Sequence, residues 1–232
     1  MITNDIFEIN RRVCFDLWNM NSVKEKDNFK YLAPRLIYPI KRDEMARISE
    51  QESKLLYCNI LNNTSYFYSI ETPTEKSYQF TGNSELSART DLTIYQQNEG
   101  IFERLVNVEF KAHNQDEKNF IKDIEKLLRE GLTGNWFHTL KNIDSRTLPN
   151  IFEKMKNSFQ KMIASIDNKV DISVVFCYCV FEKGWACLKH FDLEANDEPE
   201  GYIDSFFKLD YSIKASNIIV NDAKDWIIIE NK

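Results

Sequence analysis

Two short segments decide the fold of this chain: Ala88-Arg89-Thr90-Asp91-Leu92-Thr93-Ile94-Tyr95 and, after a polar turn, Leu105-Val106-Asn107-Val108-Glu109-Phe110-Lys111-Ala112. Both predict strands, because β-branched and aromatic residues alternate with polar ones. Side chains alternate between the two faces of a strand, so Asp91 lies on the polar face of the first segment and Glu109 and Lys111 on that of the second. If the strands pair, these carboxylates and the ammonium gather on one side of a small sheet.

Helices are predicted around these strands, because apolar residues recur there at three- and four-residue steps. They cover residues 4–20, 43–62, 116–130 and 148–166, while further strands are predicted over residues 66–71, 77–80, 171–181, 185–191, 218–220 and 226–229. A turn at Thr72-Pro73 separates the first two of these strands, and residues 133–142 give a mixed pattern. The predicted fold class is α/β (α+β-like), with a central mixed sheet of roughly four to six strands flanked by helices.

The length of 232 residues favours a single domain covering residues 1–232. Within it we expect a helical extension over residues 1–42, a core carrying the acidic strands over residues 43–130, and further helices and strands over residues 131–232.

Charge is unevenly distributed along the chain. The net charge is −6, and residues 191–232 hold 4 Lys against 10 Asp and Glu. Residues 111–169 hold 11 Lys and Arg against 8 Asp and Glu, a modest basic excess directly after the second strand. Nonspecific nucleic-acid binding depends on basic side chains that neutralise phosphates. A basic surface, if present, therefore lies after the Glu109 strand.

Cysteine usage and hydropathy predict a cytoplasmic protein with no membrane partner. The five cysteines form no C-x-x-C pair, which favours neither a disulfide framework nor a zinc site. Cys177 and Cys179 are expected to pack in the core as small apolar residues. No secretory signal pattern is found at the amino end, and the longest apolar run, residues 174–181, is too short to span a bilayer.

The acidic strands resemble the PD-(D/E)xK nuclease superfamily, which has a restriction-endonuclease-like fold. The family pattern is an acid on an early helix, an Asp at the start of a central strand, and (D/E)-x-K on the next strand. Here the Asp is Asp91, and Glu109-Phe110-Lys111 matches the last element. No proline precedes Asp91, at a position that varies in the family. The resemblance covers residues 43–130.

The resemblance implies a magnesium (or manganese) site. Asp91 and Glu109 would hold Mg²⁺, with the carbonyl of Phe110 as a further oxygen ligand. Lys111 would orient the attacking water and stabilise charge on the phosphate.

The acid on the early helix has two candidates, Glu50 and Glu52. Ser49-Glu50-Gln51-Glu52 also matches a capping box, in which a helix starts at Ser49 and Glu52 bonds back to its amide. Met45 and Ile48, however, extend the apolar stripe upstream and favour a longer helix. On that longer helix Glu52 faces the sheet and Glu50 faces solvent, so Glu52 is the preferred candidate.

Four basic residues are candidates for substrate contact. Arg89 lies on the same strand face as Asp91, and His113 continues the face of Glu109 and Lys111. Lys118 and Lys122 fall on the polar face of the following helix, where some relatives place a Lys or Gln. Solvated surface positions are the alternative for all of these residues.

The sequence therefore predicts a metal-dependent nuclease that hydrolyses phosphodiester bonds in DNA, rather than RNA, in genome defence or repair. A homodimer or larger assembly is left open. The first alternative is a noncatalytic protein of the same fold that binds nucleic acid or protein, since fold does not determine function. The second is an unrelated α+β protein in which Asp91, Glu109 and Lys111 form the wet face of a half-exposed sheet.

Overall fold

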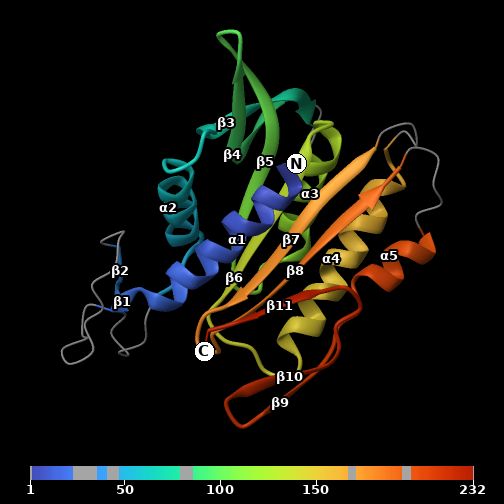
Figure 1. Cartoon of the computed structure of the whole chain (residues 1–232). Helices are drawn as coiled ribbons and strands as arrows, with labels where there is room; N and C mark the ends of the chain where they lie inside the picture. Colours follow the sequence, from blue (N-terminus) through green and yellow to red (C-terminus); the bar gives the residue numbers. More distant parts are fainter. Residues whose placement is uncertain are drawn as a thin grey trace.

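A mixed seven-stranded sheet with helices on both faces organises the chain (Figure 1). The computed structural model describes residues 2–22, 36–40, 47–78, 86–166, 171–194 and 200–231. In spatial order the sheet contains β11 (Ile227–Glu230), β8 (Trp185–Leu193), β7 (Ile172–Val180), β6 (Thr133–Leu140), β5 (Ile101–Ala112), β4 (Leu86–Asn98) and β3 (Phe67–Tyr78). The helices are α1 (Ile2–Asn19), α2 (Glu50–Leu61), α3 (Glu117–Arg129), α4 (Thr147–Ile163) and α5 (Glu200–Phe206).

Two small strand pairs lie outside this sheet. β1 (Asn21–Ser22) pairs with β2 (Ile37–Tyr38) in parallel, and β9 (Asp210–Lys214) pairs with β10 (Asn217–Asp222) antiparallel. In the large sheet β5, β6 and β7 are parallel neighbours, and the outer strands are antiparallel. The predicted α/β class with a mixed sheet flanked by helices is confirmed, although the described sheet has one strand more than the upper limit expected.

Each face of the sheet has its own apolar core. On one face α1 and α2 cover a cluster that includes Leu92, Val108 and Phe110. On the opposite face α3, α4 and α5 cover a cluster that includes Trp136 and Phe176. On β5 the apolar residues therefore face α1 and α2, while the alternate polar residues face α3.

The centre of the sheet shows why β6 was not predicted as a strand. From Gly134 to Leu140 every residue of β6 is buried, so hydrophobic and polar residues need not alternate there. Gly134 also brings α3 close to the sheet. A Cβ atom at Gly134 would lie 3.2 Å from Leu127 Cβ and 3.2 Å from Val174 Cγ2.

The elements α2 and β3 differ most clearly from the prediction. α2 begins at Glu50, with Ser49 as its N-cap and residues 47–49 outside the helix, so the longer helix is wrong there; residues 43–46 lie outside the described ranges. β3 is continuous through Thr72 and Pro73, so the predicted turn is wrong. β3 is the edge strand, where a proline without an N–H is tolerated.

Cys177 and Cys179 are buried in the core, as predicted. Among the described residues, no helix combines the length and apolarity needed to cross a bilayer.

Candidate active site

A gap opens in the sheet where β4 leaves β5. The β4–β5 pairing ends at Leu92 and Val108, whereas β4 stays paired with β3 through Thr90 and Arg89. Asp91 lies at this point, and its Oδ2 accepts a hydrogen bond from the Phe110 N–H at 2.8 Å. The N–H and C=O of one strand residue point to the same side, so the Phe110 carbonyl faces the gap as well.

Glu109 and Lys111 lie beneath α3 in a chain of ion pairs. Lys126 Nζ lies 2.7 Å from Glu109 Oε1 and 2.7 Å from Asp123 Oδ1, and Lys111 Nζ lies 2.8 Å from Asp123 Oδ2. Lys126 also donates to the carbonyl of Arg89 at 2.9 Å, which ties α3 to β4 across the gap.

This cluster is buried. Only 1% of Glu109 and 8% of Lys111 is exposed, because α3 covers the polar face of β5. The alternative in which these residues form the wet face of a half-exposed sheet is therefore wrong for Glu109 and Lys111. An uncompensated charge at such a position is costly, so each group needs an opposite charge beside it.

Burial and crowding by carboxylates set the protonation of the cluster. Burial, followed by the neighbouring Asp123 carboxylate, raises the pKa of Glu109 well above its usual range. Burial alone would raise the pKa of Asp123 as well, but Lys111 and Lys126 outweigh it and lower that pKa. Asp123 is thus the carboxylate of the cluster that its neighbours stabilise most as an anion, whereas Glu109 takes up a proton more readily than a solvated carboxylate does.

Asp91 has a second set of partners on the side of α2. Lys54 Nζ lies 3.3 Å from Asp91 Oδ1 and 2.6 Å from Glu71 Oε1. Glu71, on β3, has a positive φ of 50°, which non-glycine residues rarely adopt and which costs on the order of 1 kcal/mol or more. The gap is therefore lined from α2, α3 and the three strands β3, β4 and β5.

Glu52 closes the amino end of α2. Its Oε2 accepts from the Ser49 N–H at 2.8 Å and from the Ser49 hydroxyl at 2.6 Å, which completes a capping box. Glu52 is therefore the capping residue, as the capping-box alternative predicted, and none of these contacts with Ser49 involves the gap.

Glu50, two residues earlier, is the acid of α2 on which the charges around the gap act. Burial raises the pKa of Glu50, and the charges that also act on it are those of Lys111, Asp91, Lys54 and Asp123. Glu50 therefore lies within electrostatic reach of the gap, and it is half-buried rather than fully exposed to solvent as expected.

The predicted substrate-contacting residues lie in different surroundings. Arg89 and Lys118 are exposed, and Lys122 is half-buried. The His113 ring bonds through Nε2 to the Ile48 carbonyl at 2.8 Å, so it joins the end of β5 to the segment before α2.

Sequence reasoning missed Lys54, Glu71, Asp123 and Lys126. A signal for Lys126 existed, since Lys118, Lys122 and Lys126 follow one another at four-residue steps on one face of a helix. Asp123 lies three residues before Lys126 and pairs with it. Lys54 and Glu71 gave no comparable signal, because their meeting depends on how α2 packs against β3.

The donor set at the gap fits a hard divalent cation. Asp91 and Glu109 offer carboxylate oxygens and Phe110 a carbonyl, the ligand types that Mg²⁺ takes together with water. Glu109 Oε1 has no partner with hydrogen-bond geometry among the described residues, although Lys126 pairs with it as an ion. Across the described ranges, no three His, Cys, Asp or Glu side chains converge as a preformed metal cage. Any magnesium site here would therefore have two carboxylates and complete its shell with the carbonyl and water.

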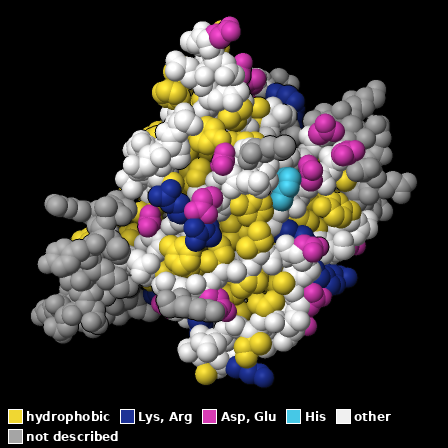
Figure 2. Space-filling model, viewed as in Figure 1, with side chains coloured by type: hydrophobic (Ala, Val, Ile, Leu, Met, Phe, Trp, Pro, Cys, Tyr) yellow, Lys and Arg dark blue, Asp and Glu magenta, His cyan; other side chains and the backbone are white. Residues whose placement is uncertain are grey.

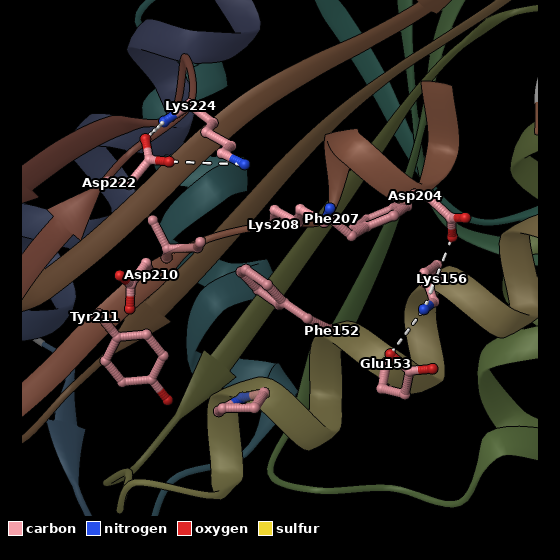
Figure 3. A pocket seen from close by; sticks show the side chains of 12 residues that line it. Phe152, Glu153, Lys156, Asp204, Phe207, Lys208, Asp210, Tyr211, Asp222 and Lys224 are labelled. Carbon is pink, nitrogen blue, oxygen red and sulfur yellow. Dashed lines mark hydrogen bonds and ion pairs between the residues drawn. The ribbon is translucent and has the colours of Figure 1, made fainter. Parts of the chain in front are cut away.

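A separate pocket of about 420 Å³ lies between α4, α5 and the β9–β10 hairpin (Figure 3). At the edge of this pocket Lys156 Nζ lies 3.0 Å from Glu153 Oε2 and 3.8 Å from Asp204 Oδ1. None of the candidate residues lines it.

Comparison with known proteins returned no relatives: no family model, curated protein or solved structure matches this chain.

Proposed function

We propose that this protein is a metal-dependent nuclease that hydrolyses phosphodiester bonds in DNA, and that its fold is restriction-endonuclease-like. The observation that carries the proposal is the bond from Asp91 to the N–H of Phe110, which places Asp91 beside the strand residue between Glu109 and Lys111, within reach of both charges, where β4 parts from β5. The order of these groups, with Glu50 on the preceding helix, follows the PD-(D/E)xK pattern. The proposal thus retains the strand residues and replaces Glu52 with Glu50 as the helix acid.

Asp91 and Glu109 would hold Mg²⁺ or Mn²⁺ together with the Phe110 carbonyl. When bound, the ion would supply Lewis-acid polarisation of the phosphate and a water of lowered pKa. Protons would compete with the metal for Glu109, because burial raises its pKa and only the carboxylate is a good ligand.

Lys111 would serve the reaction as a fixed ammonium. Asp123 holds Lys111 Nζ at 2.8 Å, and the neighbouring carboxylates outweigh burial and raise the pKa of Lys111, so it stays charged. A preorganised cation beside the phosphate stabilises the charge that develops in the transition state. Hydrolysis adds the hydroxyl of water to phosphorus and its proton to the leaving oxygen, giving a phosphate monoester and an alcohol.

Substrate contacts would come from the basic residues around the gap, namely Arg89, His113, Lys118 and Lys122. On the face shown in Figure 2 the described Lys and Arg side chains form no continuous basic area, and several of them lie beside Asp and Glu. We infer that binding relies on these local contacts and on self-association into a homodimer or larger assembly. DNA in the cytoplasm is the proposed substrate, with RNA as the competing one.

The test is cleavage of supercoiled plasmid, linear DNA and single-stranded RNA in Mg²⁺, Mn²⁺ or EDTA. We expect cleavage of DNA that needs the metal and that falls at least about 100-fold in Asp91→Asn, Glu109→Gln and Lys111→Met. These substitutions preserve side-chain volume, which limits damage to the buried cluster. Glu103→Gln is the matched control, because Glu103 lies on the same strand β5 but is exposed. Cleavage that persists in EDTA or in all three variants would refute the proposal.

One observation favours the noncatalytic alternative. The ion pairs of Glu109, Lys126, Asp123 and Lys111 balance one another without a metal, as a structural network would. If wild-type protein binds labelled DNA with equal affinity in Mg²⁺ and EDTA and cuts nothing, the fold acts as a binding module.

A further inference from the structure

Lys54 and Glu71 approach Asp91 from outside the proposed ligand set. The Lys54 side chain is only 11% exposed, and its ammonium bridges Asp91 Oδ1 and Glu71 Oε1. The other oxygen of Asp91 accepts from the Phe110 N–H. Both oxygens are thus fixed, which sets the plane of the carboxylate and directs its remaining lone pairs.

The backbone of β3 is shaped to make this contact. Glu71 has a φ of 50°, yet the pairing with β4 continues unshifted on both sides, at Ile70–Leu92 and Thr72–Thr90. The hydroxyls of Ser69 and Thr72 lie 2.6 Å apart and close over the kink. A strained residue at a point where the register is the same on both sides indicates that its neighbours hold it in that conformation.

We propose that Glu71 and Lys54 form a positioning pair for Asp91, an inference that rests on the proposed function. Lys54 holds the Asp91 carboxylate, and Glu71 holds Lys54. The edge strand β3 is thereby part of the active site although it supplies no metal ligand. Lys54 also repels a dication bound to Asp91, so the pair trades metal affinity for a fixed geometry.

The test measures Mn²⁺ binding to the free protein by calorimetry and, separately, the rate of plasmid cleavage. In Lys54→Met we expect Mn²⁺ to bind about 3- to 10-fold more tightly, because a competing cation is removed. Cleavage should nevertheless slow about 10- to 100-fold, because the Asp91 ligand is no longer aligned. A merely structural role would not produce opposite changes in the two quantities.

Glu71 acts through Lys54, so its variants should be milder and not additive. We expect Glu71→Gln to slow cleavage roughly 3- to 10-fold with little change in Mn²⁺ affinity, since half of the Glu71 side chain is exposed and screened. The double variant should cleave no more slowly than Lys54→Met alone. Lys54→Arg, which keeps the charge, should recover part of the activity.

Glu99→Gln is the matched control, because Glu99 also has a φ of 50° but lies in the exposed turn between β4 and β5. Thermal unfolding of each variant checks that it is folded. If Lys54→Met does not fold, the affinity and cleavage rate of Lys54→Arg test the positioning role instead. Lack of Mn²⁺ binding by the wild-type protein overturns both this inference and the proposed function. Wild-type cleavage with additive effects, or with parallel losses of affinity and rate, overturns the positioning pair alone.

Discussion

His138 shows how a buried side chain becomes sensitive to pH. It lies fully buried on β6, and its Nε2 bonds to the His113 carbonyl at 2.6 Å, which makes Nε2 the protonated nitrogen of a neutral ring. Burial, reinforced by the nearby Lys111 charge, lowers the pKa of His138 to about 3. His138 is therefore part of the core of the sheet.

We therefore predict that His138 destabilises the protein in mild acid. Its folded pKa is below the usual value near 6.5, so stability is present above that pH and is lost as pH falls toward 3. The loss is about 1.4 kcal/mol for each pH unit in that window. Urea unfolding at pH 7 and at pH 5 gives the free energy of unfolding at each pH. Between the two, that free energy should fall by about 2 kcal/mol more in the wild type than in His138→Gln. An equal drop in both proteins would show that His138 is not the titrating group.

The strand residues of the site could be predicted from the sequence, whereas their partners could not. Asp91, Glu109 and Lys111 follow from alternation within two strands, a local pattern. Lys126 meets Glu109 only because α3 packs over β5, and Lys54 meets Asp91 only because α2 packs against the opposite side of the gap. Such contacts depend on tertiary packing, which periodicity does not specify.

Among the helices and strands, those with a regular spacing of apolar and polar residues were predicted best. The apolar stripes of α1, α3 and α4 and the alternation in β4 and β5 each indicated the correct element. β6 was not predicted as a strand because it is buried on both faces, so its polar and apolar residues need not alternate. β3 was predicted as two strands because Pro73 favours a turn unless its place at the sheet edge is known. In both cases the position in the sheet overrides the local signal.

The amino end of α2 separates two acids that the sequence left as alternatives. Glu52→Gln should weaken the capping box, lower the free energy of unfolding by about 0.5–1 kcal/mol, and leave Mn²⁺ affinity and cleavage unchanged. Glu50→Gln should leave the cap intact but slow cleavage about tenfold or more, because it removes an anion near Asp91 and Lys111. Urea unfolding, calorimetry and plasmid cleavage check the pair, and a larger activity loss in Glu52→Gln would reverse the assignment.

For the folded chain taken together, the proposed metal site would couple metal binding to stability and to protons. A ligand that binds only the native state stabilises it, by about 2.7 kcal/mol at 100 times its dissociation constant. We predict that Mg²⁺ raises the melting temperature, and that it does so more at pH 8 than at pH 6, because Glu109 has a raised pKa and must be deprotonated to bind.

Differential scanning calorimetry with MgCl₂, and with KCl at matched ionic strength, checks this linkage. Glu109→Gln should lose the response to magnesium at both pH values. A shift of equal size in that variant would show that the ion binds elsewhere on the protein.

The close packing at Gly134 links a position outside the gap to the charged side chains that line it. α3 carries Asp123 and Lys126, and it lies so near β6 that even a methyl group at Gly134 would press on Leu127. Substitution by alanine would require Leu127 or Val174 to give by a few tenths of an ångström. A shift of Leu127 would move α3, which carries Asp123 and Lys126, so under the proposed function the gap could be retuned by a change that touches none of its charged atoms.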